Sequence, residues 1–118
     1  MIHAGNLISN SPYVWGGGHG RWLDSGYDCS GSVSFALFAG GLLTSPLSSS
    51  GFINWGEPGP GRWITLYTNP GHVYMVVAGL RFDTGNHDAT TTPRGTGPRW
   101  SSIPRSPRGF KVRHPAGL

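Results

Sequence analysis

The sequence is poor in three features, and each shortage narrows the classes of protein to which the chain can belong. It holds one cysteine, so an internal disulfide and a zinc site built from several thiolates are both excluded. Charged residues make up only 12% of the chain, and no apolar run approaches the roughly 20 residues of a membrane span. The start also lacks the basic-then-apolar pattern of a secretory signal peptide, so we expect either a cytosolic protein or a mature or excised domain.

Glycine and proline are abundant instead, with 20 and 10 residues respectively. Because these residues interrupt regular elements, the composition favours a loop-rich α+β body over helical bundles or coiled coils. A chain of 118 residues with 36% hydrophobic content is long enough for one compact core and short for two. We therefore expect a single domain over residues 1–118, either complete or excised from a longer protein, and a monomer.

The formal net charge of +4 comes largely from basic residues in the last quarter of the chain. They are Arg94, Arg99, Arg105, Arg108, Lys111 and Arg113. Such a segment can bind an anionic polymer or can simply form a solvated surface. No recognised nucleic-acid-binding motif accompanies the charge, so we expect no nucleic-acid partner, whereas anionic cell-wall polymers remain a candidate.

A helix is predicted to begin at Cys29. Apolar side chains follow it at helical spacing, and Asp28 is a residue type that caps helix starts. The pair Gly40-Gly41 is suited to end the helix. The apolar positions are Val33, Ala36 and Leu37. The cysteine is thus expected at a helix N-terminus.

Strands are predicted in the second half of the chain. Residues 44–61 are rich in Ser, Pro and Gly and predict a long surface connection, which in a compact domain often forms a rim or lid. After it, apolar and β-branched runs separated by turn residues predict strands over residues 62–68, 72–78 and 80–84. Residues 109–114 are expected to add one more strand.

Cys29 and His72 are candidates for a catalytic pair. A thiol at a helix N-terminus meets the positive end of the helix dipole and free backbone N–H groups, which favour the nucleophilic thiolate. His72 would begin a strand after a tight turn, where its ring can face a helix end. A lone cysteine is often a small buried apolar residue and a lone histidine is often structural, so the prediction depends on the pair.

An imidazole that acts as a base needs a third group to fix its tautomer and orientation. If Ala78-Gly79 forms the hairpin turn, Asp83 lies diagonal to His72 on the same face of the sheet. A turn shifted by one residue would place His87 opposite His72 instead. Asp83 is the first candidate, His87 the second and Asn86 the third, and a turn-capping role is the alternative for Asp83.

A metal site is the less favoured alternative. His19, His72 and Asp83 could hold zinc with one open coordination position, as hydrolytic zinc sites do. No short ligand spacing such as His-x-x-x-His supports this arrangement. We therefore expect neither a metal nor another cofactor.

The residues collected so far fall into three motifs in a defined order. They are Pro12-Tyr13-Val14-Trp15-Gly16-Gly17, then Tyr27-Asp28-Cys29-Ser30-Gly31, then Gly71-His72-Val73. Together they resemble the NlpC-type cell-wall peptidases, which are papain-like cysteine peptidases, over roughly residues 1–84. The resemblance implies a small α+β papain-like core, in which the cysteine begins a central helix packed on an antiparallel sheet that carries the histidine.

The resemblance also implies roles for the candidate residues. Cys29 would be the nucleophile, His72 the general base and then the general acid, and Asp83 the residue that orients the imidazole. The chain departs from the family at Asp83, because this position is usually histidine, asparagine or glutamine. An aspartate can hold an imidazole and would raise its pKa.

The same resemblance implies a substrate. The family hydrolyses peptide bonds in bacterial peptidoglycan stems, commonly between γ-D-glutamate and the following diamino acid, and Tyr13, Asp28 and Ser30 match residues that contact the stem peptide. A stem peptide is then the expected partner, at the cell wall, outside the cell, or within a phage virion or lysis protein. The alternatives are a non-catalytic wall-binding or assembly module that retains the fold, and a different thiol chemistry such as acyl transfer to or from a lipid or amide.

Overall fold

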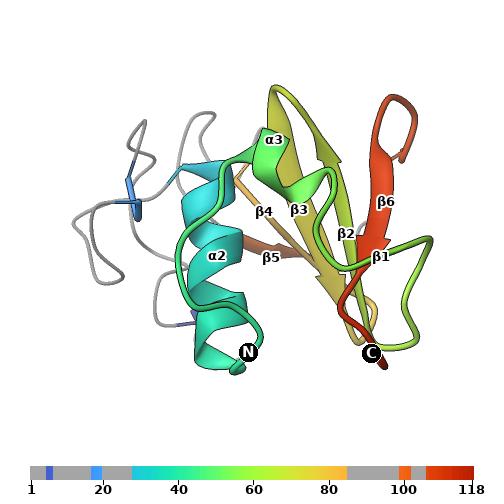
Figure 1. Cartoon of the computed structure of the whole chain (residues 1–118), viewed down its shortest axis with the longest axis horizontal. Helices are drawn as coiled ribbons and strands as arrows, with labels where there is room; N and C mark the ends of the chain where they lie inside the picture. The colour runs from blue at the N-terminus through green and yellow to red at the C-terminus, as the bar shows by residue number, and fades with distance from the viewer. Residues whose placement is uncertain (1–4, 7–16, 20–27, 85–98, 102–105) are drawn as a thin grey trace.

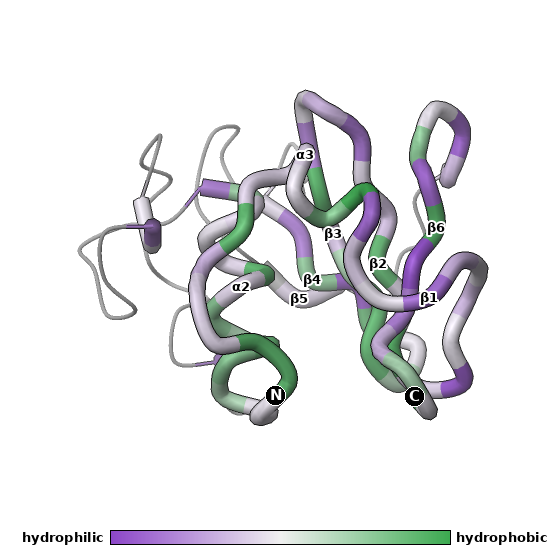
Figure 2. The backbone as a smooth tube through the Cα atoms, in the orientation of Figure 1, coloured by the Kyte–Doolittle hydropathy of each residue, from purple (hydrophilic) through white to green (hydrophobic). Residues whose placement is uncertain are grey.

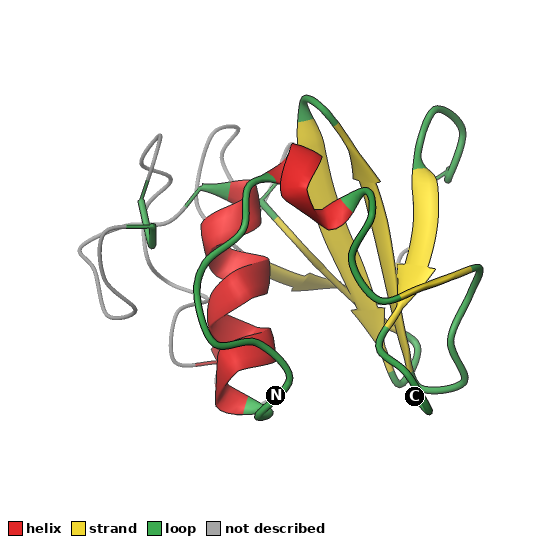
Figure 3. Cartoon of the chain, viewed as in Figure 1, coloured by secondary structure: helices red, strands yellow, loops and turns green. Residues whose placement is uncertain are grey.

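The computed structural model describes residues 5–6, 17–19, 28–84, 99–101 and 106–118 (Figure 1). These parts of the chain contain the helices α2 (Cys29–Ala39) and α3 (Ser49–Phe52). The strands are β1 (Glu57–Pro58), β2 (Ile64–Asn69), β3 (His72–Val77), β4 (Leu80–Asp83), β5 (Arg99–Ser101) and β6 (Lys111–His114). Both helices lie on the same side of the strands (Figure 3).

The strands form one antiparallel sheet in the order β1-β6-β2-β3-β4-β5. Strands β2, β3 and β4 follow one another as hairpins, whereas β6 comes from the end of the chain and inserts between β1 and β2. The predicted α+β class with an antiparallel sheet is confirmed. The C-terminal segment is part of this sheet, beside the hairpin that carries His72.

Helix α2 begins and ends where the sequence predicts. The Asp28 side chain caps the start, where its Oδ1 accepts a hydrogen bond from the backbone N–H of Gly31 at 2.7 Å. At the other end Gly41 adopts a positive φ of 75°, and its N–H donates to the carbonyl of Phe38 at 2.9 Å. This left-handed residue reverses the backbone after the last turn, which is a conformation that glycine adopts without strain.

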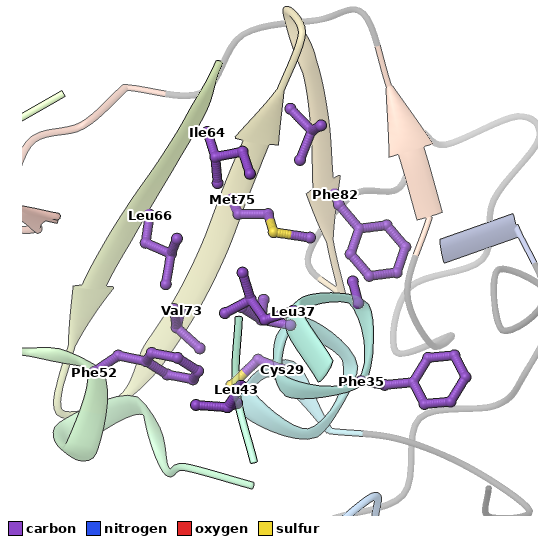
Figure 4. Packing of buried hydrophobic residues seen from close by; sticks show 13 residues of the cluster. Cys29, Phe35, Leu37, Leu43, Phe52, Ile64, Leu66, Val73, Met75 and Phe82 are labelled. Atoms are coloured by element: carbon purple, nitrogen blue, oxygen red, sulfur yellow. The ribbon is translucent and has the colours of Figure 1, made fainter. Parts of the chain in front are cut away.

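The hydrophobic core lies between α2 and the face of the sheet turned toward it, which we call the inner face (Figure 4). Its residues on β2, β3 and β4 are Ile64, Leu66, Val73, Met75, Val77 and Phe82. They alternate along each strand because successive side chains of a strand point to opposite faces. Hydropathy agrees with this arrangement, since α2, β2 and β3 all contain apolar stretches (Figure 2).

The opposite, outer face carries Tyr67, His72, Tyr74, Val76, Arg81 and Asp83, by the same alternation. This face is not open to water along its length. Tyr74 is 1% exposed and Asp83 is 0% exposed. Tyr67 stacks on Tyr74 with ring centroids 4.8 Å apart, and Phe110 packs edge-on against Tyr74 at 5.1 Å.

The predicted hairpin register between β3 and β4 is confirmed. Val77 pairs with Leu80, and the turn residues Ala78 and Gly79 both have positive φ, at 51° and 85°. Two positive φ angles are those of a type I′ turn, whose twist matches that of the flanking strands. The shifted register considered for His87 is therefore wrong, and His87 and Asn86 themselves lie outside the described residues.

The predicted surface connection over residues 44–61 is wrong in one respect. It contains α3 and β1, and Phe52 at the end of α3 is 0% exposed within the core. Ser48 caps α3 by accepting the N–H of Gly51 at 3.0 Å. Burying one aromatic ring thus orders a segment whose composition alone predicts a loop. No helix among the described residues has the length and apolar character needed to cross a membrane.

Candidate active site

The ends of one helix and two strands lie together at one end of the sheet. Cys29 is the first residue of α2, His72 is the first residue of β3, and Asp83 is the last residue of β4. Because β3 and β4 run antiparallel, the start of one lies beside the end of the other. Helix α2 packs along both strands, and its start lies at the same end of the molecule as the β2–β3 turn (Figure 1).

The side chains of the three residues form a hydrogen-bonded series. His72 Nε2 lies 2.6 Å from Asp83 Oδ1, and the His72 ring is also hydrogen-bonded to the Cys29 side chain. Since Asp83 engages Nε2, Nδ1 is the ring nitrogen that remains for Cys29. The second oxygen of Asp83 lies 3.7 Å from Arg81 Nη1. Both oxygens of this buried carboxylate therefore lie near positively charged or proton-donating groups.

The environment of His72 favours its protonated form. Burial, the largest single influence, lowers the pKa of His72, but hydrogen bonds to Asp83 and Cys29 and the charges of those residues outweigh it. The pKa is raised from 6.5 to about 9. The imidazole is thus an imidazolium near neutral pH, with one N–H directed at a carboxylate and the other at the sulfur.

The hairpin before β3 holds the backbone of His72. Asn69 Oδ1 accepts hydrogen bonds from the N–H groups of Gly71 and His72, at 2.9 Å and 2.8 Å. Such a bond from an asparagine side chain to the backbone two residues on is typical of tight turns. The tight turn predicted before His72 is confirmed at residues 69–71, and it places His72 at the first position of β3.

A second polar group, which we call the His19 cluster, lies beside Cys29 and consists of His19, Asp28 and Ser30. His19 Nε2 lies 3.0 Å from Asp28 Oδ1 and 2.9 Å from Ser30 Oγ. Asp28 and Ser30 were predicted from the motif as substrate contacts, and the structure places them together. From the sequence, His19 was a candidate only as a zinc ligand, and no sequence signal indicated its contact with Asp28 and Ser30.

A close backbone approach positions His19. The carbonyl of Gly17 accepts the N–H of Asp28 at 3.2 Å, and Gly18 has a positive φ of 86°. A Cβ added at Gly31 would lie 2.0 Å from the Gly17 oxygen, so only glycine fits at this point of α2. The glycine run and the Asp-Cys-Ser-Gly motif are thus two halves of one packing contact.

The residues considered for zinc do not come together. His19 bonds Asp28 and Ser30, whereas His72 bonds Asp83 and Cys29. Within the described part of the chain, no group of three His, Cys, Asp or Glu residues could hold a metal ion. Tyr13, the remaining predicted substrate contact, lies outside the described residues.

The basic residues near the C-terminus differ in their surroundings. Arg113 donates from Nε and Nη2 to the carbonyls of Trp55 and Gly56, both at 2.8 Å, so it ties β6 to the segment before β1. Arg108 and Lys111 are exposed. The same segment supplies Phe110, whose ring lies 6.3 Å from that of His72, and composition carried no signal for this contact.

A thiol, an imidazole and a carboxylate in hydrogen-bonded series can perform nucleophilic acyl transfer. The N–H of Cys29, at the first helical position, has no intrahelical acceptor and is suited to hold an oxyanion. No family model, curated protein or solved structure matches the chain.

Proposed function

We propose that the protein is a cysteine peptidase that hydrolyses peptide bonds in bacterial peptidoglycan stem peptides. The observation that carries this proposal is the series from Cys29 through His72 to the fully buried Asp83. The α+β architecture, with the cysteine at the start of a helix and the histidine at the start of a strand, is compatible with a papain-like core of the NlpC type. The order of the three sequence motifs supports the substrate class.

The reaction would proceed by acyl transfer through a thioester. The Cys29 thiolate attacks the scissile carbonyl carbon, and the His72 imidazolium donates its proton to the amine as the carbon–nitrogen bond breaks. Neutral His72 then takes a proton from the water that attacks the thioester, and cleavage of the carbon–sulfur bond releases the acid and restores the Cys29 thiolate beside the His72 imidazolium. Water is the only co-reactant.

Two features would lower the barrier to this reaction. An imidazolium beside the sulfur stabilises the thiolate, which is the nucleophilic form of cysteine. The backbone N–H of Cys29 would donate to the oxyanion of the tetrahedral intermediate, an interaction that contributes about 3 kcal/mol per donor in acyl-transfer enzymes. Asp83 would act through His72, since it holds Nε2 and so directs the other ring nitrogen toward the sulfur.

The substrate assignment rests on polar groups next to the nucleophile. Asp28 and Ser30 flank Cys29 in sequence, and both present oxygen atoms to the same His19 nitrogen. A carboxylate and a hydroxyl together suit an ammonium group, such as the amine end of a stem peptide. With the family resemblance, this favours cleavage after γ-D-glutamate and a location at the cell wall or in a phage virion or lysis protein.

The proposal is tested by digesting diaminopimelate-type peptidoglycan and identifying the fragments by mass spectrometry. The native protein should release γ-D-glutamyl-ended fragments, and Cys29→Ala should release none, because the nucleophile is lost. Ser50→Ala, at an exposed position of α3, is a matched control that should keep the native activity. Fragments from Cys29→Ala, or none from the native protein, would contradict the proposal.

A non-catalytic wall-binding module is the second candidate. The near-complete burial of Cys29, which is 8% exposed, favours it because a nucleophile must be reached by its substrate. In this case native protein and Cys29→Ala should both sediment with purified cell walls, and neither should release fragments. Sedimentation and fragment analysis on the same samples separate the two candidates.

A further inference from the structure

Phe110 contacts the candidate site from a segment far away in the sequence. Its ring packs at an angle of 69° against His72, with centroids 6.3 Å apart, and at 82° against Tyr74 at 5.1 Å. Tyr74 in turn stacks on Tyr67. We call these four residues, Tyr67, His72, Tyr74 and Phe110, the aromatic cluster. It joins β2, β3 and the turn before β6 on the outer face.

The turn that carries Phe110 is attached to the same hairpin end as His72. The N–H of Phe110 donates to the carbonyl of Pro107 at 3.0 Å, and Gly109 takes a positive φ of 84°. Asn69 Nδ2 donates to the carbonyl of Gly109 at 3.3 Å, while Asn69 Oδ1 accepts the N–H of His72. One asparagine side chain therefore holds both the backbone of His72 and the turn that presents Phe110.

The contact with Phe110 restricts the orientation of the His72 imidazole. A ring that must bond Asp83 through one nitrogen and Cys29 through the other can do so in one orientation only, and Phe110 packs against that orientation. Edge-to-face aromatic pairs contribute about 0.5–1.5 kcal/mol beyond the area they bury. The Phe110 ring lies on the outer face, where the His72 side chain is only 20% exposed and Asp83 is 0% exposed.

We propose that Phe110 is a positioning residue, which holds the His72 imidazole between Cys29 and Asp83, and that the turn over residues 106–110 is a wall of the active site. The contribution to catalysis rests on the proposed peptidase function. The contribution to the orientation and hydration of His72 does not, so it can be measured in the absence of any substrate.

The direct test follows the His72 Cε1–H proton by NMR as a function of pH in native protein and in Phe110→Ala. Water admitted by the substitution weakens every influence on His72, so its pKa should move from about 9 toward 6.5. Within the described residues, the charged and titratable groups near the ring are Cys29 from α2, Tyr74 from β3, and Asp83 with Arg81 from β4. Arg108 and Lys111 are close to Phe110 in sequence and are exposed. Phe110→Tyr, which retains the aromatic ring, should show the same His72 titration as the native protein.

Phe38→Ala is the matched control, because Phe38 is 41% exposed near the other end of α2. It should leave the His72 titration unchanged. A native titration in folded Phe110→Ala would overturn the proposal. If Phe110→Ala does not fold, Phe110→Leu decides in the same way, since leucine keeps an apolar side chain but lacks the aromatic ring.

The kinetic test uses the peptidoglycan digestion. Phe110→Ala should lower kcat about 10-fold to 100-fold with little change in KM, because a misplaced imidazole slows the chemical step more than it weakens binding. An unchanged kcat would overturn the catalytic part of the proposal. If the native protein cleaves nothing, the peptidase function fails, while the NMR titration still decides whether Phe110 positions His72.

Discussion

The two faces of β3 are built from alternate residues of one strand and differ in what they hold. On the inner face Val73 and Met75 are 0% exposed and pack against α2 with other aliphatic side chains. On the outer face His72 bonds Asp83, and Tyr74 packs between two further rings. A shift of one residue in the register of β3 would exchange these two sets of side chains.

One strand can thus contribute both to stability and to a polar site, because its two faces are covered by different parts of the chain. Helix α2 covers the inner face, where removing aliphatic area from water supplies the stabilisation. The turn before β6 contributes to covering the outer face, where the buried carboxylate of Asp83 needs hydrogen-bonding partners. Substitutions on the two faces should therefore separate stability from the chemistry of the site.

The largest effect on stability is expected from Met75→Ala on the inner face. Met75 is 0% exposed, and truncation of such a residue lowers the free energy of unfolding by about 2–5 kcal/mol. Its neighbour Val76 points to the outer face and is half-buried, so Val76→Ala should lower it by about 1 kcal/mol or less. Urea unfolding of both variants measures the difference, and equal losses would mean that the two faces are not distinct.

A smaller effect is expected from the pH dependence of stability, which reports on the outer face. Because the pKa of His72 is raised from 6.5 to about 9 in the folded protein, its contribution is fully present below pH 6.5 and is lost as pH rises through 9. The free energy of unfolding should fall by up to about 3 kcal/mol across this range.

The pH dependence is measured by urea unfolding at several pH values in native protein and in His72→Gln, which cannot titrate at this position. The difference between the two proteins should shrink as the pH increases. Asp83→Asn should narrow the pH window, since it removes the charge that raises the pKa of His72. Parallel curves for native protein and His72→Gln would contradict the assignment.

The smallest effect is expected at the turn that joins β3 to β4 and belongs to neither face. Among the described residues, Ala78 is the one non-glycine residue with a positive φ, at 51°. Asparagine tolerates this conformation better than alanine, so Ala78→Asn should raise the free energy of unfolding by about 1 kcal/mol or less. Ala116→Asn, at an exposed position without positive φ, is the control and should give no gain in thermal unfolding.

Local chemistry made part of this structure predictable from the sequence. The start of α2 follows from the capping residue Asp28, and its end follows from the glycine pair, because caps act within a few residues. The Ala78-Gly79 turn sets the register of β3 and β4, and that register places Asp83 on the face of His72. The helix and strand within residues 44–61 could not be predicted in this way, because Phe52 is held by burial against residues distant in sequence.

Contacts between distant segments account for what the sequence missed at the site. Nothing in composition connects the basic C-terminal segment with His72, yet β6 inserts into the sheet and brings Phe110 to the imidazole. His19 reaches Asp28 and Ser30 because Gly31 lets the Gly17 backbone approach the helix. A spacing along the chain carries no direct information about either approach.

The start of α2, the positions of the hairpin turns and the shared face of Asp83 and His72 can all be predicted from the sequence alone. These features depend on neighbours within a few residues, through caps, turn conformations and the alternation of a strand. Only the tertiary structure decided that the Cys29 thiol meets the His72 ring, that His19 joins Asp28 and Ser30, and that Phe110 contacts the imidazole. Those contacts depend on how α2, the sheet and the C-terminal segment pack, which is set by the burial of side chains from the whole chain.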